Sequence, residues 1–172
     1  MKYAFYPSIL TLLWSAAVSA LAGSPPSLIG SHEDWKAYSF MDGNEKVCFI
    51  SSQPQKQEGK FRKRGEVFFF VTRWPDKNGQ DAISISSGYP FKPESEVALR
   101  IGDMKFDLFT QGEMAWTRNP AADDSIIRDI QKGASMTVRG VSRRDTETTD
   151  TYSLKGVTDA YQSIMKECSK KS

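Results

Sequence analysis

The chain has few of the residues that most enzyme active sites use. Among its 172 residues there is one histidine, His32, and there are two cysteines, Cys48 and Cys168. Ser-His-Asp and Cys-His arrangements need an imidazole held against a nucleophile in a structured site. His32 follows a stretch rich in Pro, Gly and Ser, where we expect a surface residue. A zinc site takes three or four His, Cys or carboxylate ligands, and two cysteines joined to each other would supply none.

Phosphate-binding loops are also missing. The sequence has no GxxxxGK(S/T) motif and no GxGxxG motif after a strand, and these are the loops whose backbone amides hold nucleotide phosphates. The formal net charge of +2 gives no general attraction to nucleic acid. We therefore expect no cofactor, no metal, no nucleic-acid partner and no enzymatic activity.

Carboxylate chemistry is the main alternative, because a hydrolase needs only two such groups. Asp145, Glu147 and Asp150 lie close together in the sequence, beside Arg143 and Arg144. The same pattern is typical of a solvated turn whose charges pair with one another, which is the interpretation we adopt. The alternative function is a periplasmic enzyme or enzyme inhibitor that uses carboxylates in a pocket not visible from sequence spacing.

The start of the chain has the three parts of a secretory signal. Lys2 supplies a positive charge, an apolar run centred on ILTLLWSAAV follows, and small residues offer cleavage after Ala20 or Ala22. The apolar run is shorter than the ~20 residues that a membrane-spanning helix needs. We expect a cleaved signal over residues 1–22, an extended lead-in over residues 23–33 and a single domain over residues 34–172. No later run is apolar enough to span a bilayer, so we expect a periplasmic, secreted or surface-associated protein.

Both cysteines belong to the part that would be exported, where oxidising conditions favour disulfides. Cys48 lies in KVCFIS, which alternates like a strand, and Cys168 ends the apolar face of a C-terminal helix. We expect a bridge between them that holds this helix against the strand, worth about 4–5 kcal/mol in the chain-entropy model. Two free buried thiols, or one reactive thiol, are the alternatives. The apolar face of the helix comprises Val157, Ala160, Tyr161, Ile164 and Met165.

Short alternating segments predict a mainly β fold without a βαβ rhythm. One internal helix has clear boundaries, since Asn119 can cap it, Pro120 suits its first turn and Gly133 can end it. We expect an antiparallel β-sandwich or barrel of about eight strands, with this mid-chain helix and the C-terminal helix packed on it. The expected strands lie within residues 34–40, 46–51, 66–74, 81–88, 96–102, 104–110, 114–118, 135–142 and 148–154.

Residues 54–65 form an expected loop that carries a dense basic run. Lys60, Arg62, Lys63 and Arg64 suit contact with an anionic envelope lipid or with an acidic patch of an envelope or host protein, at ~1 kcal/mol per basic residue near an anionic surface. Phe61 within the run favours binding. The alternative is a solvated loop whose charges keep the following aromatic strand from aggregating. The oligomeric state stays open.

The order of several segments resembles the invasion-associated locus B family of bacterial proteins. These segments are DWKAY, KVCFISSQP, GYPFK, KFDLF, AWTR and the block KGASMTVRGVSRRDTETTDTYSLKGVTDAYQSIMKEC, and together they reach from Asp34 to Cys168. The chain departs from the family at one turn, where Ser142-Arg143-Arg144 stands in place of the usual Ser-Arg-Gly. Some members also carry further cysteines near the first tryptophan, and this chain has none there.

The resemblance implies a periplasmic or surface-associated protein with a role in bacterial invasion of host cells. It implies no catalytic residue and no cofactor. We therefore expect a non-enzymatic envelope or interaction protein that contributes to host-cell association.

Overall fold

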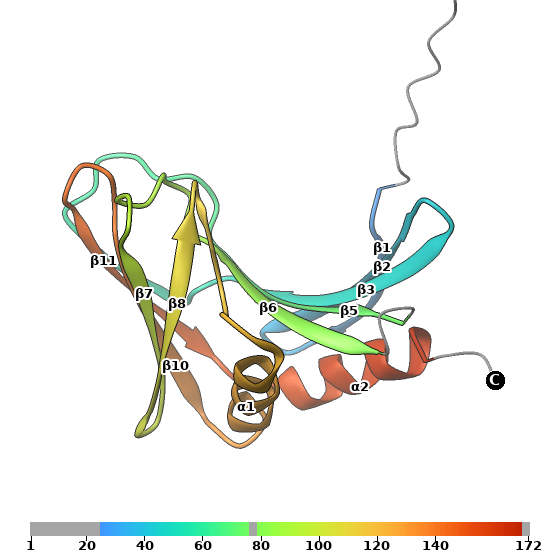
Figure 1. The fold of residues 1–172 in the computed structure, drawn as a ribbon. Helices are drawn as coiled ribbons and strands as arrows, with labels where there is room; N and C mark the ends of the chain where they lie inside the picture. Colours follow the sequence, from blue (N-terminus) through green and yellow to red (C-terminus); the bar gives the residue numbers. More distant parts are fainter. Residues whose placement is uncertain (1–24, 76–78, 170–172) are drawn as a thin grey trace, which may run out of the picture.

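The computed structural model describes residues 25–75 and 79–169, which form eleven strands and two helices (Figure 1). The predicted signal, residues 1–22, lies outside the described residues. The elements are β1 (Ser27–His32), β2 (Trp35–Asp42), β3 (Glu45–Ser52), β4 (Lys56–Gly59), β5 (Phe68–Trp74), β6 (Gln80–Ser86), β7 (Glu96–Ile101), β8 (Met104–Gln111), β9 (Met114–Trp116), α1 (Pro120–Ile130), β10 (Ser135–Val141), β11 (Glu147–Ser153) and α2 (Val157–Glu167).

All the strands belong to one antiparallel sheet. Its order is β1-β2-β3-β5-β6-β9-β8-β7-β10-β11-β4, so β1 and β4 are its edges and the sheet is not closed. Most neighbours are consecutive strands joined by short turns, which is the usual way to build antiparallel pairs. The predicted fold class, mainly β and antiparallel with two helices, is confirmed.

The predicted count of about eight strands, drawn from nine segments, is lower than the eleven observed, because two strands lie in segments without an apolar pattern. β1 falls in the lead-in and pairs with β2. β4 falls in the expected loop at residues 54–65, and all four of its residues are exposed. It is an edge strand that pairs only with β11, so its side chains need no buried face and leave no alternation in the sequence.

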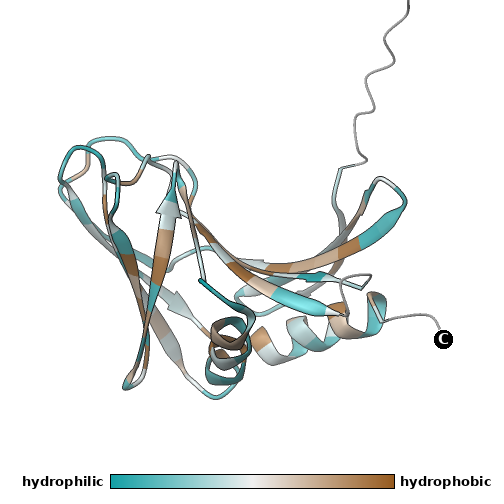
Figure 2. Cartoon of the chain, viewed as in Figure 1, coloured by the Kyte–Doolittle hydropathy of each residue, from teal (hydrophilic) through white to brown (hydrophobic). Residues whose placement is uncertain are grey.

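The buried side of the sheet follows the register of the strands. Ala37, Ile50, Val71 and Ile83 are successive cross-strand partners on β2, β3, β5 and β6, and all four are fully buried. Since side chains alternate between the two faces of a strand, the residues next to each of these four along its strand lie on the opposite face of the sheet. Figure 2 shows the resulting apolar bands along these strands.

The sheet folds across itself, so the same core is shared by its two halves. The ring of Phe69 on β5 meets that of Tyr152 on β11 at 6.1 Å and that of Trp35 on β2 at 5.9 Å. The Trp35 indole Nε1 donates to the carbonyl oxygen of Ser153 at 3.0 Å. The result is a sandwich-like arrangement around a single apolar core.

Both helices begin and pack as their sequences predict. The Asn119 side chain caps α1 by accepting from the Ala122 N–H at 3.0 Å, and α1 packs against β6. Helix α2 packs on β1, β2 and β3. In the ribbon of Figure 1 the two helices lie on the same side of the curved part of the sheet. In the described ranges, no helix is both long and apolar enough to cross a membrane.

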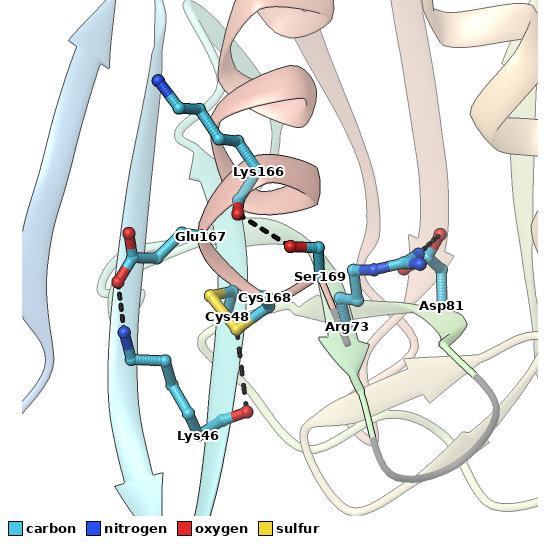
Figure 3. Close-up of a disulfide and its surroundings, with 8 residues drawn as sticks. All are labelled: Lys46, Cys48, Arg73, Asp81, Lys166, Glu167, Cys168 and Ser169. Carbon is cyan, nitrogen blue, oxygen red and sulfur yellow. Dashed lines mark hydrogen bonds and ion pairs between the residues drawn. A yellow bond between two sulfur atoms is a disulfide. The ribbon is translucent and has the colours of Figure 1, made fainter. Parts of the chain in front are cut away.

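The predicted disulfide is present (Figure 3). It joins Cys48 on β3 to Cys168 at the end of α2, with the two Cα atoms 6.0 Å apart. Both cysteines are buried, and an ion pair between Lys46 and Glu167 lies beside them on the surface. The bridge spans 120 positions of sequence and fastens the C-terminal helix to the third strand.

His32 is half-buried, so it is less exposed than its sequence context predicts. It ends β1, and its Nε2 lies 3.0 Å from the hydroxyl of Ser163 on α2. This contact ties the edge strand to the helix. The described residues contain no group of three or more His, Cys, Asp and Glu side chains that could hold a metal.

Candidate functional site

A cleft of about 630 Å³ lies where the β4–β5 connection meets the turn between β10 and β11. We call it the basic cleft, because its lining includes six cationic residues and no acidic one. The segment between β6 and β7 supplies the third wall. The lining residues are Lys60, Phe61, Arg62, Lys63, Arg64, Gly65, Gly88, Tyr89, Pro90, Ser142, Arg143, Arg144, Thr146 and Thr148.

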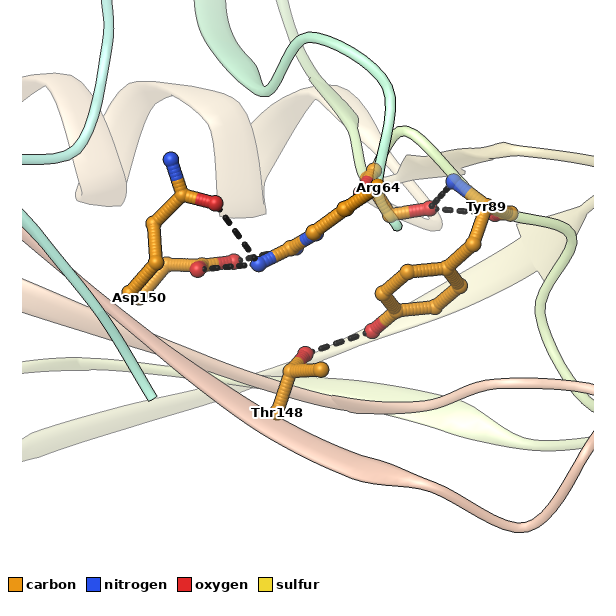
Figure 4. A network of polar contacts seen from close by, with 6 residues as sticks. Arg64, Tyr89, Thr148 and Asp150 are labelled. Atoms are coloured by element: carbon orange, nitrogen blue, oxygen red, sulfur yellow. Dashed lines mark hydrogen bonds and ion pairs between the residues drawn. The ribbon is translucent and has the colours of Figure 1, made fainter. Parts of the chain in front are cut away.

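Arg64 anchors the β4–β5 connection to the sheet (Figure 4). Its Nη1 and Nη2 donate to the two carboxylate oxygens of Asp150 on β11, at 2.6 and 2.7 Å, and its Nε donates to the carbonyl oxygen of Ser87 at 2.7 Å. Both charged side chains are only 3% exposed. A bidentate arginine–carboxylate pair has a fixed geometry, so this pair sets the path of the connection.

Two aromatic rings pack against the buried guanidinium. The Arg64 Cζ lies 4.9 Å from the ring centre of Tyr89 and 5.5 Å from that of Phe61. The Tyr89 hydroxyl is 2.6 Å from the hydroxyl of Thr148, and burial raises the pKa of Tyr89 above its usual value. The phenol therefore stays neutral, so it adds no negative charge to the cleft.

The turn between β10 and β11 is held by its own hydrogen bonds and by the neighbouring segment. The Ser142 N–H donates to the carbonyl of Thr146, and the Ser142 hydroxyl accepts from the N–H groups of Arg144 and Thr146. The Arg143 N–H donates to the carbonyl of Pro90 at 2.8 Å. These bonds present two consecutive arginines at the mouth of the cleft.

Among the described residues, the other five cations of the cleft have no counter-charge. Lys60, Arg62, Lys63, Arg143 and Arg144 are all exposed. Within residues 25–75 and 79–169, no carboxylate forms an ion pair with any of them. Like charges that converge without partners raise the local positive potential, and an anion that enters the cleft lowers it. The cleft therefore combines exposed cations with the aromatic residues Phe61 and Tyr89.

Comparison with known proteins identifies the family of this chain. The model of the family described as invasion associated locus B (IalB) protein matches residues 35–165. The chain belongs to this family. A crystal structure of invasion associated protein B from Bartonella henselae has a TM-score of 0.60 to this chain, covering 84% of it and 97% of that protein, at 13% identity. This likeness shows the shared fold. A search of curated proteins finds no match.

The structure separates the four predicted contact residues of this IalB family member into three that are exposed and one that is buried. Lys60, Arg62 and Lys63 line the cleft and are exposed, but Arg64 points inward and is neutralised by Asp150. The sequence does not distinguish Arg64, which anchors the connection, from the other three residues, since all four belong to one basic run. Lys56, in the same run, lies on β4 and pairs with Glu58.

The cluster of charges at residues 143–150 is not the self-paired turn that the sequence predicts. Asp145 pairs with Lys92, Glu147 with Arg139 on the adjacent strand, and Asp150 with Arg64. The two arginines of the turn are thereby left without an ion pair to any carboxylate in the described part of the chain. Their place in the site could have been inferred only from the antiparallel partner strands, because the basic run is some 80 residues away in the sequence.

A second pocket, of about 510 Å³, contains the two carboxylates Asp81 and Asp123. Asp81 accepts from Arg73 and from the Tyr161 hydroxyl. Asp123 is 5% exposed, and its Oδ1 accepts from the Ile83 N–H at 2.8 Å and from the Thr117 hydroxyl at 2.6 Å. Burial raises the pKa of Asp123. These bonds join α1 and α2 to the sheet, so both carboxylates have structural roles.

Proposed function

We propose that this IalB family member is an exported, non-enzymatic envelope protein that binds the phosphate-bearing headgroup of an anionic envelope lipid in the basic cleft. The observation that carries the proposal is the convergence, on one concave site with an aromatic floor, of five cations that form no ion pair with a described residue. A concave site suits a headgroup better than the flat surface of a protein partner. Arginine and lysine donors match phosphate oxygens.

Export is supported by the signal-like first 22 residues and by the disulfide, since such bonds persist in oxidising compartments. The family name refers to invasion, and we extend the proposal to a contribution to host-cell association. N-terminal sequencing of the protein from culture fractions tests the first step. We expect a chain that begins after Ala20 or Ala22, in the periplasmic or secreted fraction.

The binding step can be tested by cosedimentation with vesicles. The mature protein should bind vesicles of phosphatidylcholine that contain phosphatidylglycerol or lipid A, and it should not bind pure phosphatidylcholine. Reversing two charges with Arg143→Glu and Arg144→Glu should weaken binding at least about tenfold, at ~1 kcal/mol per basic residue. About 0.5 M salt should weaken the wild type similarly, because exposed charges are screened.

A matched control reverses two exposed charges elsewhere, with Arg128→Glu and Lys132→Glu on and after α1. This variant should bind anionic vesicles nearly as well as the wild type. Equal losses in both variants would mean that net charge, and not the cleft, drives binding. No vesicle binding, together with capture of an acidic protein through Arg143 and Arg144, would replace the lipid headgroup with a protein partner.

A further inference from the structure

The face of the sheet opposite the two helices carries a continuous set of aromatic side chains. One register row crosses five strands, because Ser51 on β3 pairs with Phe70, Phe70 with Ser84, Ser84 with Trp116 and Trp116 with Phe109. Cross-strand partners project from the same face. We call this surface the aromatic face. Its aromatic residues, assigned by register, are Tyr38, Phe40, Phe49, Phe68, Phe70, Trp74, Phe109 and Trp116.

These rings contact one another but remain partly exposed. The ring of Phe49 stacks on Tyr38 at 5.0 Å and meets Phe40 and Phe70 edge-on at 6.0 and 5.9 Å. Phe109 and Trp116 stack at 5.6 Å. All eight aromatic residues are intermediate in exposure, whereas most of the alternate residues of the same strands are buried in the core. Neither helix covers this side (Figures 1 and 2).

The pocket of about 510 Å³ lies at one end of the aromatic face. Strand β9 pairs with β6 only as far as Trp116, which is opposite Ser84. The earlier part of β6, from Gln80, therefore has no strand on the side where β9 would continue, and the pocket lies there. Trp74, Phe109 and Trp116 line it, together with the exposed amides of Gln80 and Gln111.

Asp123 offers this pocket a carboxylate oxygen that accepts no hydrogen bond from a described residue. Asp123, which is 5% exposed, receives both of its hydrogen bonds on Oδ1. No described residue donates to its Oδ2, and Asp123 lines the pocket. A ligand hydroxyl would satisfy that oxygen. Asn119 lines the same pocket, and since its Oδ1 accepts the Ala122 N–H, its amide NH₂ is left to donate to a ligand.

We infer that the aromatic face and its pocket bind a neutral oligosaccharide. The flat apolar side of a sugar ring packs on an aromatic ring, and its hydroxyls need the amide and carboxylate groups that the pocket offers. Aliphatic side chains are scarce on the face, where Ala82 and Met114 are the partly exposed ones. An apolar protein or lipid partner would select for such side chains.

The arginine and one of the two carboxylates near the pocket are already paired, and the other carboxylate, Asp123, would repel an anion, which favours an uncharged ligand over an anionic one. Arg118 lines the pocket, stacks over the Phe109 ring at 5.9 Å and pairs with Glu96. Asp81 is paired with Arg73. An added peptide strand is disfavoured, because the Ile83 N–H on the open edge of β6 already donates to Asp123. This surface therefore differs in chemistry from the basic cleft.

Titration with neutral tetrasaccharides tests the inference. Chitotetraose and cellotetraose should change the tryptophan fluorescence of the mature protein, because Trp74 and Trp116 lie in the pocket. The Trp116→Ala variant should bind either sugar at least about tenfold more weakly, the size expected for the loss of one aromatic contact. Trp116→Phe should retain most of the affinity. Gln111→Ala, an exposed change that leaves the core intact, should reduce affinity severalfold in calorimetry.

A matched control removes an exposed apolar side chain elsewhere, with Met104→Ala at the start of β8. It should leave sugar affinity unchanged. Three outcomes would overturn the inference. In the first, the folded protein binds no sugar on an array of neutral glycans. In the second, binding is the same in Trp116→Ala. In the third, the protein dimerises through this face, and Trp116→Ala yields monomers.

Discussion

Two distant parts of the sheet are fastened by different chemistry. Near the β1 edge, a covalent bond joins β3 to α2 through Cys48 and Cys168. Near the β4 edge, a buried ion pair joins the β4–β5 connection to β11 through Arg64 and Asp150. The disulfide acts mainly by restricting the unfolded chain, whereas the ion pair must offset the cost of burying two charges. The stability of the region near β1 therefore depends on redox conditions, and the stability of the region near β4 depends on the presence of both charged side chains.

The largest effect is expected from removing the covalent bond. Replacing both cysteines, with Cys48→Ala and Cys168→Ala, should lower the free energy of unfolding by about 4–5 kcal/mol, because the bond closes a loop spanning 120 positions. Urea denaturation measures the change. Adding a reductant to the wild type should have a similar effect and should leave the double variant unchanged. A loss close to zero would mean that packing alone holds α2 in place.

Removing one charge of the ion pair should cost almost as much. Asp150→Ala leaves the Arg64 guanidinium buried without its carboxylate, which we expect to destabilise the protein by about 3–5 kcal/mol. Denaturation at neutral pH measures this loss. The double variant Arg64→Met with Asp150→Leu should recover most of it, because no unpaired charge remains. If the double variant is as unstable as the single one, the hydrogen bonds of Arg64 to Ser87 and Gln57 matter more than the ion pair.

The two helices extend the comparison at a smaller scale. Helix α1 has a side-chain cap from Asn119, whereas α2 begins at Gly156 without one and ends at the disulfide. Asn119→Ala should therefore destabilise the protein by about 1 kcal/mol, the usual value of an N-cap. Thermal unfolding measures it, and Asn119→Asp should keep the wild-type stability. A loss near zero in Asn119→Ala would show that the packing of α1 on β6 makes the cap redundant.

The smallest effect concerns a buried carboxylate that lacks an arginine. Burial raises the pKa of Asp123 above its ordinary value of 3.8. A raised pKa in the folded protein means that the contribution of this group to stability is present below the unfolded pKa and is lost as pH rises through the folded pKa. Asp123→Asn cannot ionise and keeps an oxygen acceptor for Ile83 and Thr117, so it should be slightly more stable than the wild type at neutral pH.

Melting temperatures across pH test this last expectation. The advantage of Asp123→Asn should shrink as the pH falls to about 3, where the wild-type carboxyl is protonated as well. A variant that is less stable at every pH, with no change in the difference, would show that hydrogen bonding and not ionisation controls this site.

The secondary structure was predictable wherever local chemistry decides it. The cap at Asn119, the apolar face that ends at Cys168 and the alternation around Ile83 and Ile85 each led to the correct element. β1 and β4 were missed, because an edge strand can form from any sequence that a neighbour pairs with. Half of the basic cleft was predictable from the run at Lys60–Arg64. The role of Arg64 was not, because burial depends on Asp150, 86 positions later.

The amino-acid sequence by itself determined that this protein would be a mainly antiparallel β domain with two helices, and it restricted the two cysteines to a single intramolecular pairing. Those properties follow from periodicity, capping and cysteine count, which act over a few residues or need no geometry. Only the tertiary structure decided which cations face a cleft and which one is buried, and that aromatic side chains from five strands share one uncovered face. Strand order and register bring such residues together, and these depend on contacts between segments that are far apart in the chain.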